Sequence, residues 1–581
     1  MRSRAHAHRW RGERGVTLLD VLIGTALMLL IFIGIAGVFQ LSIDVITNNR
    51  SRAGAIALLN ERMEYLRSLS YTQIGVIGGI PAGNVPQEET VPLGDLEYTR
   101  RTFVNYTDDP GDGLGENDDN NITADYKTIR VEVIWESRQG ERSITLVGRV
   151  SPVGIEVAVP GGTLLVNVVD ESASAVSNAQ VDIINLNTNP SIDIRTYTNV
   201  NGQVVFIGAP AASDYQITIS KTGYSSAQTY PVTAENPNPD PRHLTVAESL
   251  TTSSDFVIDL LADKTVETYR DVQEGTWEDT FSDQSYIAET ASTTVSGGAA
   301  TLTGGVGAYD EEGSLQSISI APPNLAQWKT FIATTSVPAQ TSLLFRFYDV
   351  SGSTLIPEGQ LPGNAAGFTA TSIDLTNVST TTYPAMRVTS ALSSADPNET
   401  SSIDAYSFIY DYGPEPFPNL SFSMRSEKTI GNNPAVYKYD EELSSGSLAS
   451  ITLSDIEADT YTLGIASTTG YALSRSCEPQ PETLLPGASQ TTRLFVVPAS
   501  EHSLLIDVRT DAGALLSGAS AELSAVGYAV TELTGTCGQT FFSELNAEAY
   551  TLTVTLSGFD PYTTAVNVSG ATHLSVVLNP E

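Results

Sequence analysis

Residues 14–39 read RGVTLLDVLIGTALMLLIFIGIAGVF, and this stretch decides how the fold begins. The nineteen residues from Val21 to Phe39 carry no charge, and a helix of that length crosses a bilayer. Asp20 immediately precedes this apolar run. Placing a carboxylate in lipid is costly, so its presence there indicates a functional role. Five arginines precede the run, which favours a cytoplasmic N-terminus.

The helix is expected to continue beyond the apolar run. No proline occurs from Val16 to Leu69, and the polar half of this segment repeats apolar residues at helical spacing. We predict one helix over residues 16–69, roughly 80 Å long at 1.5 Å per residue. Its first half would lie in lipid or in a filament core, and its second half would pack on a globular head.

These features resemble the N-terminus of type IV prepilins and pseudopilins. The resemblance implies that residues 1–15 are a leader, that a prepilin peptidase cleaves after Gly15, and that the new first residue, Val16, is N-methylated. It also implies that Asp20, the fifth mature residue, meets an N-terminal amine as subunits assemble. The family usually has phenylalanine first and glutamate fifth, whereas this chain has valine and aspartate.

A secretory signal and a plain membrane anchor are the two alternatives for the N-terminus. A secretory signal also has a basic flank, but its apolar core is shorter and is followed by an A-x-A-like cleavage site, which is not present after Phe39. A plain membrane anchor fits the length and the charge, but it gives no reason for Gly15 or Asp20.

Residues 70–156 are predicted to form a small pilin-like head. Ile129, Val131, Val133 and Trp135 alternate with more polar residues, broken only by Ile134, which is typical of a strand with one buried face. Segments 98–104 and 143–150 would supply its neighbours in a three-stranded antiparallel sheet laid over the helix.

An acidic loop, residues 108–121, separates two of these strands. Calcium takes several oxygen ligands from a flexible loop, so Asp108, Asp109, Asp112, Asp118 and Asp119 are candidate calcium ligands. Their spacing is not that of an EF-hand, and aspartate, asparagine, glycine and proline also build ordinary solvated turns. A hairpin loop without metal is the alternative, and no other cofactor is expected.

The chain beyond Val157 contains an internal repeat. Residues 201–206 read NGQVVF and are followed by alternating YQITI at 215–219, and residues 537–542 read CGQTFF and are followed by YTLTV at 550–554. This pattern resembles carboxypeptidase regulatory-like and Cna-B-like β-sandwich modules, which are structural or interaction domains. The resemblance implies modules at 157–248 and 499–581 and a divergent one at 413–498.

Between the repeats, residues 249–412 show strand-like alternation without helical periodicity, which predicts a jelly-roll-like sandwich. Such sandwiches often bind glycans through exposed aromatic rings, and Trp277 and Trp328 are the candidates here. The alternative for each tryptophan is a place in the hydrophobic core.

Composition narrows the functional classes. The net charge of -37 would repel phosphate, so nucleic acid is an unexpected partner. The five histidines are dispersed, and the chain has no H-E-x-x-H, G-x-S-x-G or P-loop motif, so no enzyme activity is expected. Secretion would permit a disulfide between the two cysteines, Cys477 and Cys537; two buried thiols are the alternative.

The sequence therefore predicts a multidomain, mainly β protein with a long N-terminal transmembrane helix, a small α+β head and a string of β-sandwich modules. Its expected function is that of a minor type IV pilin-like or pseudopilin subunit, with other pilin subunits as partners. We expect a single-pass precursor in the bacterial cytoplasmic membrane, and then an extracellular filament or cell surface. The alternative is a membrane-anchored surface adhesin whose sandwiches bind carbohydrate or protein.

Overall fold

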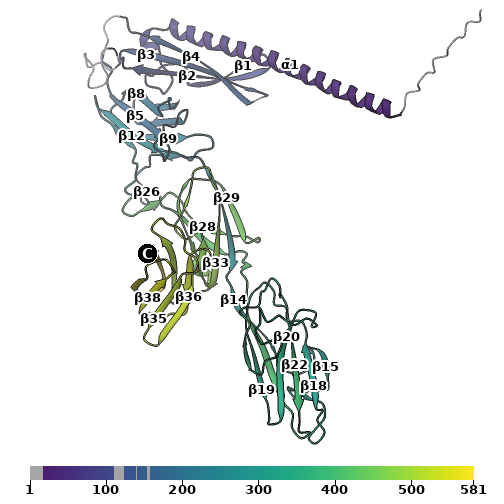
Figure 1. The fold of residues 1–581 in the computed structure, drawn as a ribbon. Coiled ribbons are helices and arrows are strands. Elements are labelled where there is room, and N and C mark those ends of the chain that lie inside the picture. The colour runs from purple at the N-terminus through teal and green to yellow at the C-terminus, as the bar shows by residue number, and fades with distance from the viewer. Residues whose placement is uncertain (1–17, 110, 112–123, 139, 154–157) are drawn as a thin grey trace, which may run out of the picture. The chain divides into compact units, whose positions relative to one another are not determined.

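The computed structural model describes residues 18–109, 111, 124–138, 140–153 and 158–581 (Figure 1). The chain divides into two compact units. Unit 1 comprises residues 1–260 and 430–436, and unit 2 comprises residues 261–429 and 437–581. In the described residues, unit 1 consists of a long N-terminal helix, a single head sheet and a β-sandwich, and unit 2 consists of β-sandwiches, so the predicted fold class is confirmed.

Helix α1 spans Leu18–Ser68 and opens unit 1. Its C-terminal half buries one stripe of side chains, which includes Ala55, Leu59, Met63 and Leu66. These residues lie three or four apart, so they share one face of the helix. That face packs on the head sheet and forms one hydrophobic core with it.

The head sheet is antiparallel in the order β1-β2-β3-β4. Its strands are β1 Glu88–Leu93, β2 Leu96–Thr107, β3 Tyr126–Ser137 and β4 Gly140–Val150. The alternation predicted for residues 129–135 is confirmed, because Ile129, Val131 and Val133 are fully buried. The sheet has one strand more than expected, β1. This strand was not predicted because it carries two glutamates and a proline and shows no apolar alternation.

A sandwich follows the head within unit 1. One sheet has the order β12-β5-β8 and the other β10-β9-β6-β7, with β11 pairing β9. The strands are β5 Gly162–Val169, β6 Gln180–Asn185, β7 Ile192–Tyr197, β8 Gln203–Ala209, β9 Ala212–Ser220, β10 Ala227–Gln228, β11 Leu244–Val246 and β12 Thr251–Val257. The last strand, β12, lies parallel to the first, β5, so the module extends to about residue 260 rather than 248.

Unit 2 contains a sandwich interrupted by another domain. Its first strand, β13 (Ala262–Arg270), pairs in parallel with its last strand, β33 (Ser489–Pro498). The other strands are β24 Glu415–Pro416, β25 Ser421–Ser426, β28 Asp440–Ser444, β29 Ser450–Ile456, β30 Asp459–Ile465, β31 Tyr471–Cys477 and β32 Glu482–Leu484. The start predicted for the jelly-roll-like domain at residue 249 is therefore wrong, because β13 belongs to the interrupted module. The predicted end of that domain at residue 412 coincides with the end of β23.

A buried ion pair ties this interrupted module together. The Lys264 ammonium on β13 is fully buried and lies 2.6 Å from a Glu482 oxygen and 2.7 Å from the Thr492 hydroxyl. Because an uncompensated charge in a core is strongly destabilising, the position of β13 is linked to that of β32 and β33.

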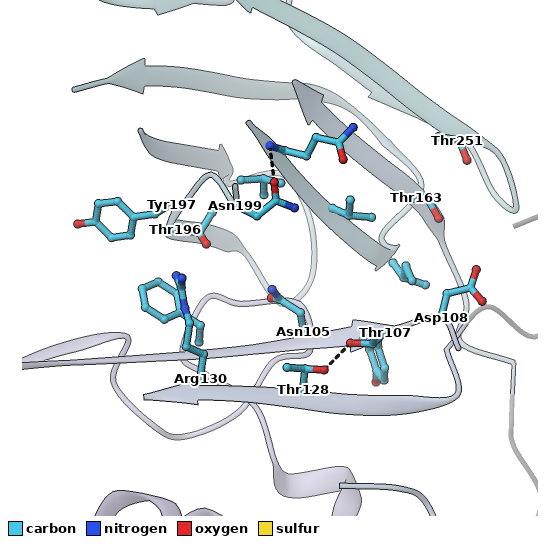
Figure 2. Close-up of a pocket in the computed structure, with 16 residues that line it drawn as sticks. Asn105, Thr107, Asp108, Thr128, Arg130, Thr163, Thr196, Tyr197, Asn199 and Thr251 are labelled. Carbon is cyan, nitrogen blue, oxygen red and sulfur yellow. Dashed lines mark hydrogen bonds between the residues drawn. The ribbon is translucent and has the colours of Figure 1, made fainter. Parts of the chain in front are cut away.

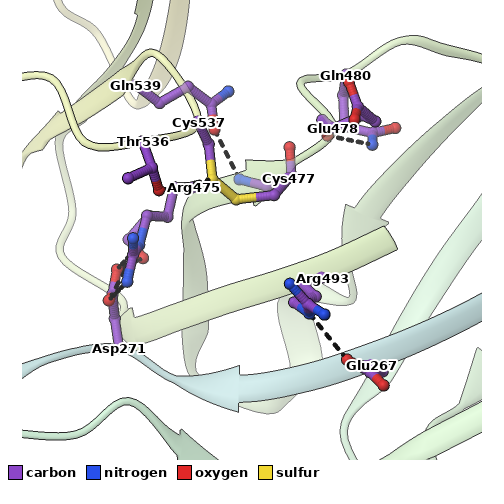
Figure 3. The surroundings of a disulfide bond; sticks show 12 residues. Glu267, Asp271, Arg475, Cys477, Glu478, Gln480, Arg493, Thr536, Cys537 and Gln539 are labelled. Carbon is purple, nitrogen blue, oxygen red and sulfur yellow. Dashed lines mark hydrogen bonds and ion pairs between the residues drawn. A yellow bond between two sulfur atoms is a disulfide. The ribbon is translucent and has the colours of Figure 1, made fainter. Parts of the chain in front are cut away.

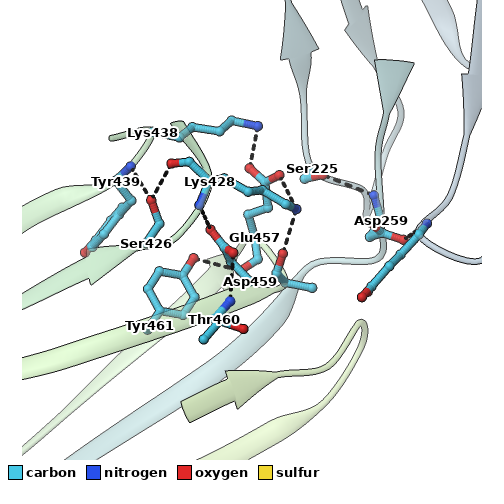
Figure 4. Close-up of polar contacts among 12 residues, drawn as sticks. Ser225, Asp259, Ser426, Lys428, Lys438, Tyr439, Glu457, Asp459, Thr460 and Tyr461 are labelled. Atoms are coloured by element: carbon cyan, nitrogen blue, oxygen red, sulfur yellow. Dashed lines mark hydrogen bonds and ion pairs between the residues drawn. The ribbon is translucent and has the colours of Figure 1, made fainter. Parts of the chain in front are cut away.

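A short hairpin leaves the same module, formed by β26 (Thr429–Gly431) and β27 (Val436–Tyr437). Its base in unit 2 is held by Glu457, which accepts from Lys428 at 2.9 Å and pairs with Lys438 at 2.5 Å (Figure 4). Its tip, residues 430–436, belongs to unit 1.

The inserted domain occupies residues 273–412 and is an antiparallel sandwich of a six-stranded and a four-stranded sheet. Its strands are β14 Gln273–Asp279, β15 Ile287–Ala291, β16 Thr293–Ser296, β17 Ala299–Leu302, β18 Glu312–Ser317, β19 Leu325–Ser336, β20 Thr341–Tyr348, β21 Ser372–Asp374, β22 Arg387–Ser394 and β23 Ser402–Tyr412. The two sheets enclose an aromatic-rich core.

The C-terminal module repeats the arrangement of the first sandwich. Its first strand, β34, lies between the parallel last strand β40 and the antiparallel β37, as β5 lies between β12 and β8. The strands are β34 Ser503–Thr510, β35 Ser520–Ala525, β36 Tyr528–Leu533, β37 Gln539–Phe542, β38 Ala549–Thr555, β39 Tyr562–Asn567 and β40 Ala571–Leu578. The internal repeat therefore corresponds to a repeated sandwich.

Candidate functional site

The N-terminal half of α1 exposes its apolar side chains. Leu30, Phe32 and Phe39 are 71%, 63% and 68% exposed, although such residues are normally buried in soluble domains. Among the described residues, one helix is long and apolar enough to cross a membrane; it spans Val21–Ser68, and an 18-residue window within it has a mean hydropathy of 2.7. The same helix thus presents an apolar surface to its surroundings and a packed surface to the head.

The residues predicted for processing lie at or before the start of this helix. Gly15 and Val16 fall outside the described residues. The backbone of Asp20 is helical, two residues after α1 begins at Leu18. Asp20 therefore stands in the first turn of the helix, N-terminal to the exposed apolar half.

The helix meets the head at a point where glycine is required. A Cβ placed on Gly54 would lie 2.8 Å from the Tyr98 hydroxyl oxygen and 3.2 Å from Leu93 Cδ2. That hydroxyl donates to the Ser51 carbonyl at 3.0 Å, and the Tyr98 side chain is buried. Gly54 thus lets α1 approach β2 closely.

A cluster of charges reinforces the same contact. Arg100 on β2 donates to Glu89 on β1 at 2.9 Å and to the Leu58 carbonyl of α1 at 3.3 Å. Arg62 of α1 also pairs with Glu89. Burial lowers the pKa of both guanidinium groups, but the adjacent carboxylates keep them ionised. Sequence reasoning missed this cluster, because its members lie on three separate elements.

Lys127 on β3 is a second buried cation in the head. Its ammonium donates to the Tyr71 and Ile74 carbonyls, each at 2.7 Å, and lies 4.6 Å from the centre of the Tyr71 ring. Desolvation lowers its pKa from 10.5 to about 8. These bonds hold the segment that follows α1 against the sheet.

The acidic loop is described only in part. Asp112, Asp118 and Asp119 lie outside the described residues, while Asp108 and Asp109 lie just after β2. The Asp109 amide donates to the Asp125 carboxylate, and the Gly111 amide donates to Asp109 Oδ1 at 3.1 Å. No cluster of three metal-ligating side chains occurs in the part of the chain that the structure describes. Calcium binding by the loop stays a prediction.

Cys477 and Cys537 are joined by a disulfide with a Cα–Cα distance of 5.3 Å (Figure 3). Cys477 ends β31 of the interrupted module, and Cys537 lies just before β37 of the C-terminal module. Beside the bridge, the Ser476 amide donates to Gln539 Oε1 at 2.7 Å. Covalent and hydrogen bonds thus connect the two modules within unit 2.

Of the two tryptophans proposed as a glycan platform, Trp328 lies in the core of the inserted domain, and Trp277 is half-buried against that core. Trp328 is fully buried and donates its Nε1–H to the Tyr383 carbonyl at 2.9 Å. Trp277 packs among Tyr286, Tyr406 and Phe408. The prediction is wrong for Trp328, because its ring is enclosed in the sandwich core, whereas glycan contact by Trp277 stays a prediction.

No protein-family model and no curated protein sequence matches the chain. Similar solved structures include the Bacillus anthracis TIE protein, which is 10% identical with a TM-score of 0.15 over 85% of this chain and 73% of that one. The shaft pilin SpaA of Lactobacillus rhamnosus GG is 13% identical, with a TM-score of 0.12 over 29% of this chain and 90% of that one. BcpA, the major pilin subunit of Bacillus cereus, is 8% identical, with a TM-score of 0.13 over 72% of this chain and 100% of that one.

Proposed function

We propose that this protein is a minor type IV pilin-like subunit that displays a modular β-rich ectodomain on a filament or cell surface. The observation that carries the proposal is the division of α1, which leaves its N-terminal half apolar and exposed and buries one face of its C-terminal half on a four-stranded sheet. A helix built in this way can stay in lipid as a precursor and pack with like helices after extraction.

Processing belongs to the same proposal. A prepilin peptidase would cleave between Gly15 and Val16 and methylate Val16, and the Asp20 carboxylate would pair with an amine of a neighbouring subunit. In a medium of low dielectric such a pair helps select the register between helices, whereas one carboxylate at the edge of an apolar run does not prevent insertion.

The proposal is tested with two variants of the full-length protein. Gly15→Leu should leave an uncleaved precursor in the membrane, whereas intact-mass analysis of the wild type should find methylated Val16 as the first residue. Asp20→Ala should be cleaved and inserted like the wild type but recovered at least several-fold less in sheared filaments. A wild-type chain that starts at Met1 or beyond Phe39 would refute the processing step.

The second candidate function is a surface adhesin held by the same helix. It differs from the first in where the protein resides after processing. Immunogold labelling that follows fibres or marks their ends supports the pilin-like subunit. Labelling confined to the cell envelope, together with equal behaviour of Asp20→Ala and wild type, supports the anchored adhesin.

A further inference from the structure

A cleft of about 570 Å³ lies within unit 1, between the head sheet and the first sandwich (Figure 2). Strands β2 and β3 of the head form one wall, and β5, β7, β8 and the turn that precedes β8 form the other. Neither the membrane helix nor the disulfide contributes to it. The proposed assembly function leaves this cleft without a role.

Specific contacts hold the two walls apart at a fixed spacing. Gln87 of the head accepts from the Arg195 amide of β7 at 2.7 Å, and the Gly78 carbonyl accepts from the Asp193 amide at 3.0 Å. Ile80 of the head is buried in the core of the sandwich. The cleft is therefore part of the folded unit and is formed before any ligand arrives.

Uncharged hydrogen-bonding groups dominate the lining. They include the amides of Asn105 and Asn199 and the hydroxyls of Thr128, Thr163 and Thr196. Asp108 also lines the cleft and adds one carboxylate (Figure 2). Hydroxyl and carboxamide groups both donate and accept, as sugar hydroxyls do. Rings of Phe103 and Tyr197 meet edge to face at 6.0 Å on one side of the cleft.

Arg130 is the exceptional residue of the cleft. Its guanidinium lies 4.2 Å from the centre of the Phe103 ring and is half-buried. Among the described residues, no carboxylate lies within ion-pairing distance of this guanidinium, and no oxygen accepts a hydrogen bond from it. The charges of Glu132 and Arg101 act on its pKa at longer range. Neighbouring Arg101 and Arg195, by contrast, are paired with Glu88 and Asp182. A desolvated guanidinium with five N–H donors and no acceptor is matched by a planar anion.

From this arrangement we infer that the cleft is a binding site for an acidic saccharide, whose carboxylate pairs with Arg130 and whose hydroxyls bond to the threonine and asparagine side chains. A polyanion such as nucleic acid fits poorly, because the chain has a net charge of -37 and the cleft offers a single unpaired cation. A neutral glycan would leave the guanidinium without an acceptor.

The test uses full-length protein in detergent and two matched pairs of probes, sialyllactose with lactose and trigalacturonate with galactotriose. Isothermal titration should show that at least one acidic probe binds ten times or more tighter than its neutral partner. Arg130→Gln should abolish that preference. The matched control is Arg149→Gln, because the Arg149 guanidinium also stacks on an aromatic ring, Tyr126 at 4.8 Å, but lies outside the cleft.

Loss of the preference in Arg130→Gln and its retention in Arg149→Gln, with hydrogen exchange of β3 unchanged in both, supports the site. Equal binding of acidic and neutral probes by the wild type, no binding of any probe, or the same preference in Arg130→Gln overturns it. Stronger binding of a short peptide with a free C-terminal carboxylate than of either acidic probe also overturns it, in favour of a peptide ligand.

Discussion

At the scale of single residues, Lys127 makes the stability of the head depend on pH. Its pKa is about 8 in the folded head and 10.5 when unperturbed, so between these values the unfolded chain binds more protons than the folded one. Stability must therefore rise with pH across this interval. Tyr71, which lies against the amine, stays neutral in the folded head because burial raises its pKa to about 12.

We predict that the free energy of unfolding of the head increases by roughly 2 kcal/mol between pH 8 and pH 10, and that Lys127→Met removes most of this increase. Hydrogen exchange of peptides from β3, corrected for the intrinsic pH dependence of exchange, measures it. Lys221→Met is the matched control, because the Lys221 amine also lies over a tyrosine ring, at 4.4 Å, but is bonded at the surface. An unchanged pH slope in Lys127→Met would contradict the assignment.

At the level of secondary-structure elements, a disulfide and a hydrogen bond connect the end of β31 to the start of β37. The disulfide closes a separation of 60 residues, and its neighbour Arg475 pairs with Asp271 at 2.7 Å, next to β13. Interfaces between domains of one chain are usually modest, so a covalent link limits how freely the two modules move.

We predict that replacing both Cys477 and Cys537 by alanine lowers the free energy of unfolding of the joined modules by about 4 kcal/mol, on the chain-entropy model. Urea unfolding followed by hydrogen exchange of β31 and β37 peptides measures the change. Gln539→Ala separates the bridge from the hydrogen bond beside it, and we expect a smaller loss of about 1 kcal/mol from that variant. Full alkylation of both thiols in unreduced wild-type protein would show that the bridge is not formed.

At the scale of the whole molecule, the inserted domain is separable from its host. Arg270 and Glu415 are register partners on β13 and β24, on either side of the insertion. A methyl group placed on Gly413 would lie 3.5 Å from Val272 Cα, so the chain leaves and re-enters the host module at adjacent points. Domain insertions at such points are well tolerated.

Deleting residues 273–412 and joining Val272 directly to Gly413 should therefore leave the interrupted module folded. The measurement is the hydrogen-exchange protection of β13 and β33, together with oxidation of Cys477 and Cys537. Val266→Asp is the contrasting variant, because Val266 is fully buried on β13 and a carboxylate there should unfold the module. Loss of β33 protection in the deletion variant would show that the host depends on its insert.

Much of this architecture is encoded locally. The uncharged run from Val21 to Phe39 determines a membrane-length helix because every residue in it is apolar or small, whatever the rest of the chain does. Alternation over residues 129–135 determines a half-buried strand, and the glycine and aromatic spacing of the repeat determines two of the sandwich modules. These patterns do not depend on contacts with distant residues, so they could be predicted from the local sequence.

Other features exist only through tertiary structure. β13 lies more than 200 residues before β33, and no local pattern shows that the two pair in parallel across an inserted domain. From the sequence, Trp328 is as compatible with an exposed binding surface as with the core. It lies in the core because the opposite sheet covers it, and that depends on distant parts of the chain. Arg130 is an ordinary outward residue of an alternating strand until the first sandwich closes over it and removes water without supplying an acceptor. The helix, the strands and the repeated modules are thus encoded in the chain, since they follow from local periodicity. The insertion, the charged contact between helix and head, and the cleft arise only on folding, since burial and pairing depend on residues far apart in the chain.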